Sequence, residues 1–201
     1  FSKKKAKKLK DNILDFDLRK IIARAGANGL STQKLRALAS DKRFLRKLSI
    51  KEAYNLEGYL YPATYRFYNS QPTPSEFFER MTKEFFNRLP SDYASRAKSL
   101  GISVHQAVII ASLIEKEATM KDEKNLVAEV IFNRLKKSIP LGIDASVIYG
   151  INNWGGNLTK KHLRDSSNIF NLRIHRGLPP SPISSPSLSS LLAVLEPSNK
   201  G

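Results

Sequence analysis

The segment from residue 103 to residue 118 constrains the fold most, because it predicts a helix that must be buried. Ser103 and Gln106 match a capping box, in which each side chain bonds the backbone N–H of the other residue. The helix that follows is apolar over more than half of its circumference, through Ala107, Ile110, Ala111, Ile114 and Ala118. So wide an apolar surface is typical of a helix surrounded by other elements. We therefore expect a buried helix here.

The rest of the chain predicts further helices and two extended segments. N-cap residues and apolar spacing indicate helices that begin near Asp17, Ser31, Asp41, Thr73, Ser91, Thr159 and Ser187, and apolar spacing indicates another over residues 126–135. Residues 55–68 are rich in aromatic side chains and indicate an extended or strand-like segment, and residues 170–176 are a candidate strand. Four prolines between residues 177 and 186 exclude a helix there. The expected fold class is α+β, helix-rich with short strands.

Basic residues are concentrated in the first quarter of the chain. Residues 1–51 hold 16 Lys and Arg against 4 Asp and Glu, whereas residues 52–201 hold 18 against 14. We therefore divide the chain into a basic helical unit, residues 1–54, and a larger unit, residues 55–201. From composition alone, the positive charge favours nucleic acid, anionic lipid or an acidic polymer as a partner. The Lys-rich run at residues 2–10 predicts a frayed segment or a helix start.

Several classes of site are excluded by what the sequence lacks. There is no cysteine, which removes disulfides, thiol nucleophiles and cysteine-based zinc sites. The sequence has no phosphate-binding or dinucleotide-binding glycine motif, and its three histidines lack ligand spacing, so we expect no metal and no cofactor. No apolar run is long enough to span a membrane. Because the chain begins with Phe1 rather than Met, we expect a piece of a longer protein.

Two acidic residues on the buried helix, Glu115 and Glu117, are the candidates for acid–base chemistry. Residues two apart on a helix point about 200° apart, so only one of them can face a given substrate. The neighbours of Glu115 one turn away are small, which leaves room for a ligand, whereas those of Glu117 are large. Burial on an apolar helix also raises the pKa of a carboxyl group, which suits a general acid. These observations favour Glu115. The alternative is that both acids are solvated or paired with Lys116 and Lys121.

Other polar residues lie in apolar or loop surroundings and are further candidates. They are Glu57, Asn133, Asp144 and Asn171. Each of them can equally be a structural hydrogen-bonding group, because buried Asn and Asp side chains usually bond the backbone. Tyr149 and Trp154 have rings able to stack on sugars, although aromatic residues more often belong to the core.

Five motifs stand in a fixed order along the chain: LEGYLYPATY at residues 56–65, ASLIEKEA at 111–118, VIFNRL at 130–135, LGIDASVIYG at 141–150, and FNLR followed by GLPPSPI at 170–183. Together they resemble the YceG-like endolytic murein transglycosylases (the MltG family). The basic unit before them is similar, less distinctly, to the LysM-like subdomain of the family. The motifs together are very specific to this family.

The resemblance implies a bacterial cell-wall lyase. Such enzymes cut the β-1,4 bond between N-acetylmuramic acid and N-acetylglucosamine inside nascent glycan strands, which leaves a 1,6-anhydro end and terminates the strand. The resemblance also implies an N-terminal membrane helix, a location on the outer, periplasmic side of the cytoplasmic membrane, and peptidoglycan synthases nearby. It places the catalytic acid at Glu115. Asn133, Asp144, Tyr149 and Asn171 would then line the site, and Glu57 would orient Glu115 or contact substrate.

The sequence departs from the family pattern at a few positions. Ala63 replaces an Asp, Ala145 and Ser146 replace a Pro-Thr pair, and Arg173 replaces a common aromatic residue. The chain also ends before the strand-rich tail of the family. Two other functions stay open: a wall-binding scaffold without catalysis, and a basic nucleic-acid-binding module. The basic segment shows no homeodomain, RRM or KH pattern, so we do not expect nucleic acid as the partner.

Overall fold

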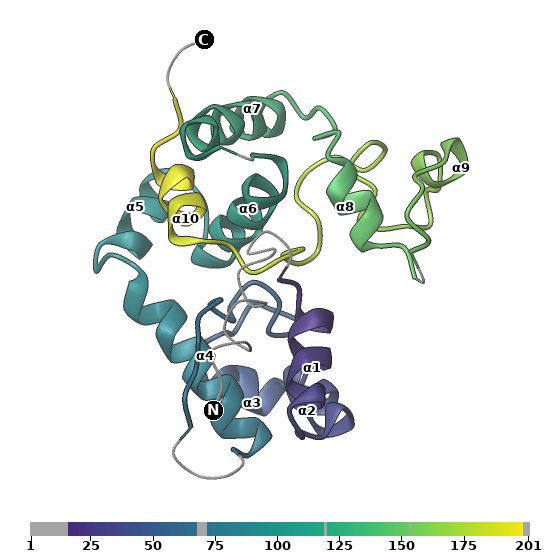
Figure 1. Ribbon diagram of the computed structural model, residues 1–201. Helices are drawn as coiled ribbons and strands as arrows, with labels where there is room; N and C mark the ends of the chain where they lie inside the picture. The colour runs from purple at the N-terminus through teal and green to yellow at the C-terminus, as the bar shows by residue number, and fades with distance from the viewer. Residues whose placement is uncertain (1–15, 68–71, 119, 153, 199–201) are drawn as a thin grey trace.

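Figure 1 shows the computed structural model, which describes residues 16–67, 72–118, 120–152 and 154–198. All regular elements in these ranges are helical, which confirms the helix-rich prediction. The helices are α1 (Leu18–Ala27), α2 (Thr32–Ala39), α3 (Lys42–Lys47), α4 (Pro74–Arg88), α5 (Tyr93–Ser99), α6 (Val104–Glu117), the 3₁₀-helix η2 (Lys121–Glu123), α7 (Lys124–Lys136), α8 (Asp144–Tyr149), α9 (Lys160–Leu163) and α10 (Leu188–Leu195).

The α6 helix is the predicted buried helix, and it lies among the other helices of the upper half in Figure 1. Every residue from Ala107 to Glu115 is buried. The helices α5, α7, α8 and α10 all contact α6. Its capping box forms as expected: the Gln106 N–H donates to Ser103 Oγ (3.2 Å) and the Ser103 N–H donates to Gln106 Oε1 (2.8 Å). The sequence at this helix therefore determines both its start and its burial.

The helices α1 to α4 make up the lower half of the molecule (Figure 1). Asp17, Ser31 and Asp41 cap α1, α2 and α3 as predicted, each accepting a backbone N–H three residues along the chain. Apolar residues of both halves belong to one buried cluster. No strand borders α1–α3 among the described residues, so the LysM-like character of this unit stays a prediction, as does a domain boundary at residue 54.

Neither segment expected to be extended or strand-like forms a β-strand in the residues that the structure describes. In residues 55–67, the Leu56 N–H donates to Ala39 O (3.0 Å) and the Tyr61 N–H donates to Met81 O (3.4 Å), so these backbone groups bond helical residues and not a neighbouring strand. In residues 170–176, the N–H groups of Ile174 and His175 both donate to Asn171 O within the same segment. Strand propensity is therefore overridden by helical partners in residues 55–67 and by local turns in residues 170–176. Tyr68 and the Lys-rich run at residues 2–10 lie outside the described residues.

The proline-containing arm, residues 177–186, crosses α6 without forming a helix, as its prolines predicted. The Ile183 N–H donates to Ser112 Oγ (3.1 Å), and Ser184 Oγ donates to Ser112 O (3.2 Å). Gly58 also packs against the arm, and its backbone has a left-handed conformation (φ 86°). A β-carbon at Gly58 would lie 2.6 Å from the Pro182 side chain, so only glycine allows this approach.

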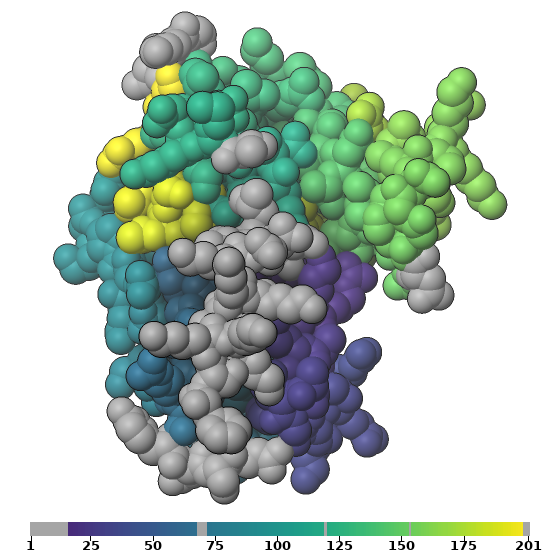
Figure 2. Space-filling model, viewed as in Figure 1, coloured from purple at the N-terminus to yellow at the C-terminus, as the bar shows by residue number. Residues whose placement is uncertain are grey.

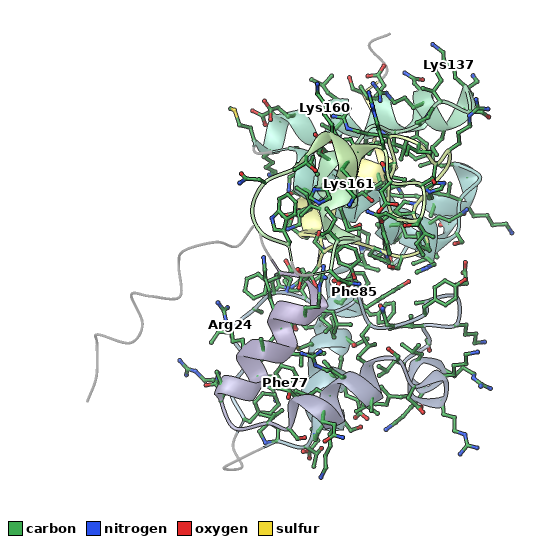
Figure 3. The ribbon with its side chains drawn as sticks, turned by 90° about the vertical axis from the view of Figure 1, so that its right-hand side faces the viewer. Arg24, Phe77, Phe85, Lys137, Lys160 and Lys161 are labelled. Carbon is green, nitrogen blue, oxygen red and sulfur yellow. The ribbon has the colours of Figure 1, made fainter. Side chains whose placement is uncertain are left out.

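The segment that carries α9 projects from the upper half, beyond α8, in Figures 1 and 2. In Figure 3 the labelled Lys160 and Lys161 of α9 lie in this upper half. Among the described residues, no single helix is long and apolar enough to cross a bilayer. The α5 and α6 helices together have that length and composition, but the pair is bent by 88°.

Candidate active site

Glu115, the predicted catalytic residue, is enclosed by the chain itself. Its side chain is 5% exposed, and its Oε2 accepts hydrogen bonds from Lys124 Nζ (3.1 Å), from the Ser187 N–H (3.1 Å) and Oγ (2.6 Å), and from Ser190 Oγ. The small neighbours Ala111 and Ser112 do leave a trough, but the proline-containing arm and the start of α10 fill it. The expected room for a ligand beside Glu115 is therefore absent in this structure.

The electrostatic expectation for Glu115 is also corrected. Burial acts to raise the pKa of this carboxyl group, but the hydrogen bonds from Ser187 and Ser190 and the charge of Lys124 outweigh burial and lower the pKa. The group is therefore a stable carboxylate at neutral pH. An ionised carboxylate has no proton to donate.

Glu117 has the opposite surroundings, although it lies on the same helix one residue beyond Lys116. It is the last residue of α6, and it is exposed. Nearby protein atoms still keep some water away from its carboxyl group, and this partial desolvation raises the pKa of Glu117. The negative charge of Asp144 also raises this pKa, and the positive charge of Arg173 lowers it by less. Glu117 is thus a carboxyl group that solvent and ligands can reach and that holds its proton more tightly than usual.

Asp144 lies beside Glu117 because α8 packs against α6. Asp144 is the first residue of α8. Arg173 donates two hydrogen bonds to its carboxylate, from Nη2 to Oδ2 (3.0 Å) and from Nε to Oδ1. Both side chains are 43% exposed, so the pair is accessible to solvent. Arg134 of α7 holds the entry to α8 by donating to Leu141 O (2.7 Å). Three chain segments therefore bring Glu117, Asp144 and Arg173 together at the surface.

Glu57 does not orient Glu115, contrary to the expectation. It is 1% exposed, both of its oxygens accept the Leu18 N–H (3.0 and 3.1 Å), and Oε2 accepts the Tyr149 OH (2.9 Å). Burial is the largest effect, and it raises the pKa of Glu57 to about 7. The hydrogen bonds from Leu18 and Tyr149 and the charge of Arg19 act to lower this pKa, whereas the charge of Asp17 acts to raise it. Glu57 is thus a buried group that joins α1 to α8.

Asn171 is a structural residue, and Asn133 is a surface residue of α7. The Asn171 side chain is fully buried and donates to three backbone carbonyls, of His162, Leu163 and Asp165. It therefore holds the end of α9 in place, so a direct contact with substrate has no support here. Asn133 is exposed on α7, and no hydrogen bond of its side chain ties it to the site. Trp154 is half-buried, with its ring 6.1 Å from that of His162.

The sequence did not reveal the residues that bond Glu115 and Tyr149. Ser190 lies 75 residues from Glu115 and Lys124 lies 9 residues from it, and no motif connects them. Arg19, which donates to Tyr149 O (3.0 Å), is separated from it by 130 residues. Arg173 did stand out, because it replaces an aromatic residue of the family pattern, but its partner Asp144 lies 29 residues away.

Two hollows in the surface lie away from these residues. One, of about 510 Å³, is lined by Phe16, Ile21, Arg24, Phe77 and other residues of α1, α4 and the segment between them. Figure 3 places Arg24 and Phe77 in the lower half of the molecule. The other, of about 620 Å³, lies along α4. Neither lining includes Glu115, Glu117, Asp144 or Arg173. The cluster of Glu117, Asp144 and Arg173 is the better candidate site, because it holds an exposed carboxyl group with a raised pKa. Among the described residues, no three His, Asp or Glu side chains are grouped to hold a metal ion.

Comparison with known proteins gives consistent matches. The YceG-like family model matches residues 5–201. A relative from Bacillus subtilis named endolytic murein transglycosylase is 38% identical over 142 residues, which are 71% of this chain and 39% of the relative. A relative of the same name from Streptococcus pneumoniae is 33% identical over 162 residues, 77% of this chain and 29% of the relative. The chain thus spans less than half the length of either protein.

A solved structure agrees with these matches. The crystal structure of a YceG-like protein from Listeria monocytogenes resembles this chain with a TM-score of 0.82 and 28% identity, covering 92% of this chain and 65% of that one. The fold likeness therefore extends over nearly the whole chain. Because the family match, the sequence identities and the fold coincide, this chain belongs to the YceG-like family.

Proposed function

We propose that this chain is the catalytic part of an endolytic murein transglycosylase. It would cut the β-1,4 bond between N-acetylmuramic acid and N-acetylglucosamine within uncrosslinked glycan strands. The observation that carries the proposal is an exposed carboxyl group with a raised pKa, Glu117, in a member of a family whose curated relatives bear this name. The acidic motif at Asp144 and the basic Arg173 supply its immediate surroundings.

The proposed proton donor is Glu117 and not Glu115. A general acid must reach the leaving oxygen and must be protonated near neutral pH. Glu117 is exposed and its pKa is raised, which favours both requirements. Glu115 is buried, its pKa is lowered, and its Oε2 accepts hydrogen bonds from Lys124 of α7 and from Ser187 and Ser190 at the start of α10. We assign Glu115 a structural role, in which its carboxylate fixes the arm and α10 against the last turns of α6.

One carboxyl group is enough for this reaction. The glycosidic C–O bond breaks as Glu117 protonates the leaving oxygen, and the N-acetyl oxygen of the substrate stabilises the positive charge that develops at C1. The C6 hydroxyl oxygen then bonds C1, and its proton passes to the Glu117 carboxylate, which restores the acid. The product is a 1,6-anhydro-muramyl end, and no water is consumed. Asp144 favours the protonated form of Glu117 at the start of this cycle.

The products of the reaction test the proposal. The wild-type chain is incubated with purified uncrosslinked glycan strands, and the fragments are identified by mass spectrometry. We expect 1,6-anhydro ends at internal cuts. Reducing ends would indicate a hydrolase, and binding to glycan without any product would favour the wall-binding scaffold; either result would contradict the proposal.

We further propose that the chain works at the outer face of the cytoplasmic membrane, near peptidoglycan synthases. The support is the family resemblance together with the surface of α1–α3, where every Lys and Arg between residues 16 and 51 is exposed. Each such residue near an anionic membrane contributes about 1 kcal/mol of attraction. Sedimentation with vesicles that contain anionic lipid, compared with neutral vesicles, tests this placement; equal binding to both would contradict it.

A further inference from the structure

We propose that Glu57 and Tyr149 are positioning residues, whose hydrogen bond fixes α8 and thereby keeps Asp144 beside Glu117. The inference rests on the proposed function, because it concerns how the acid of that reaction is held. It also changes the expected role of both residues, which the sequence pointed to as contacts of the substrate.

The Glu57 carboxylate is the fixed end of this connection. It is almost completely buried, and it accepts the first backbone N–H of α1, that of Leu18, with both oxygens. Its own N–H donates to Asn55 Oδ1 (2.8 Å). The neighbouring Gly58 packs against the proline-containing arm. Glu57 is therefore held from several sides and cannot follow a movement of α8.

Tyr149, the last residue of α8, is held at three places. Its OH donates to Glu57 Oε2 (2.9 Å), and its backbone O accepts Arg19 Nη2 (3.0 Å). The Arg19 guanidinium also lies over its ring, 4.7 Å from the centroid, and the Phe170 ring meets it edge-on at 4.9 Å. Two of these contacts come from the start of α1, so α1 and the segment around Glu57 set the position of the C-terminal end of α8.

The other end of α8 carries the acid that acts on Glu117. The helix has six residues, so Asp144 and Tyr149 are separated by about 7.5 Å along its axis. A helix this short moves as one body, and a displacement at Tyr149 is passed to Asp144. The charge of Asp144 raises the pKa of Glu117, and its effect falls with distance. Loss of the Tyr149–Glu57 bond is therefore expected to change the proton affinity of Glu117.

Tyr149→Phe tests the inference, because it removes the OH and keeps the ring. The matched control is Tyr59→Phe, which removes another buried OH, bonded to His105 Nδ1 at 2.7 Å and not to α8. Cleavage of uncrosslinked glycan is measured across pH for both variants and for the wild type. For Tyr149→Phe we expect kcat to fall about 10- to 100-fold with KM within twofold of wild type, because small misplacements of catalytic groups have effects of this size.

The pH profile separates positioning from a general loss of structure. As Asp144 moves away from Glu117, the pH above which activity falls should shift to a lower value in Tyr149→Phe and stay unchanged in Tyr59→Phe. Arg19→Gln, which removes a tether from the exposed side, should give a smaller shift in the same direction. If Tyr149→Phe does not fold, Arg19→Gln tests the inference in its place.

The outcomes distinguish this inference from the proposed function. If the wild type forms 1,6-anhydro ends but neither Tyr149→Phe nor Arg19→Gln changes kcat or the pH profile, the positioning role is wrong and the proposed function stands. A change in KM alone would also overturn it, in favour of a substrate contact. If the wild type forms no such ends, both the proposed function and this inference are overturned.

Discussion

At the scale of single residues, the two glutamates near the end of α6 differ because of what surrounds them. Glu115 accepts four hydrogen bonds on one oxygen and is ionised, whereas Glu117 is exposed and holds its proton more tightly. Removing the Glu115 charge would leave Lys124 buried without a counter-charge, which typically costs about 3–5 kcal/mol. Two glutamates on one helix therefore have opposite pKa shifts, which suit Glu115 to the structural role and Glu117 to the catalytic role that we propose.

The surroundings of Glu117 predict opposite effects for two substitutions. Because Asp144 raises the pKa of Glu117, Asp144→Asn should shift the alkaline fall in activity to lower pH. Because Arg173 lowers that pKa, Arg173→Gln should shift the fall to higher pH. The rate of glycan cleavage as a function of pH measures both shifts. Shifts of the same sign in the two variants would contradict the assignment of Glu117 as the acid.

At the scale of elements, close approach between segments matters as much as the helices themselves. The segment around Gly58 meets the proline-containing arm and α6 because glycine has no β-carbon there. Both the arm and this segment lack regular structure, and their backbone groups bond α6, α2 and α4. The position of the irregular segments therefore depends on contacts with the helices.

Gly58→Ala tests the importance of this approach, and Gly101→Ala is its control. Both glycines have a positive φ, of 86° and 75°, so alanine is strained by about 1–2 kcal/mol at either position. Only at Gly58 does the added β-carbon also meet Pro182 and Val108, at 2.6 and 2.9 Å. Chemical denaturation should show a larger loss of the free energy of unfolding for Gly58→Ala. Equal losses would mean that the arm adjusts freely.

The elements show which features of a sequence are readable in advance. Caps such as Asp17 and Ser103 were predicted correctly, because a cap bonds N–H groups only three residues away. The segment expected to be extended or strand-like, residues 55–68, forms no strand in its described part, because partners of its backbone lie on α2 and α4. Glu115 was favoured for its small neighbours, yet those neighbours receive an arm about 70 residues further along the chain. Local chemistry was predictable, and contacts between distant segments were not.

At the scale of the whole molecule, Glu57 and Tyr149 join the basic helices of the lower half to the half that carries the candidate site. The Lys and Arg side chains of α1–α3 are exposed, whereas Asp17 and Glu57 at this junction are buried. Because burial raises the pKa of Glu57 to about 7, the stability of the chain should depend on the protonation of this group.

The pH dependence of stability tests that junction. The pKa of Glu57 is about 7 in the folded chain, against an ordinary value of 4.5, so between these values the folded state keeps a proton that the unfolded state has released. Stability therefore falls as the pH rises from about 4.5 to about 7, by roughly 3 kcal/mol from this group. Denaturation at pH 4.5 and pH 8 should show this change in the wild type relative to Glu57→Gln. An unchanged difference between the two proteins would contradict the raised pKa.

The central claim is that Glu117, and not Glu115, donates the proton. The most direct measurement is the rate at which 1,6-anhydro ends form on uncrosslinked glycan with Glu117→Gln and with Glu115→Gln, each checked for folding, and with Glu79→Gln on α4 as a control far from the site. We predict that Glu117→Gln folds like the wild type and loses at least about 100-fold in rate. Glu115→Gln should lose stability but keep activity where it is folded. A folded Glu115→Gln without activity, or an active Glu117→Gln, would contradict the account.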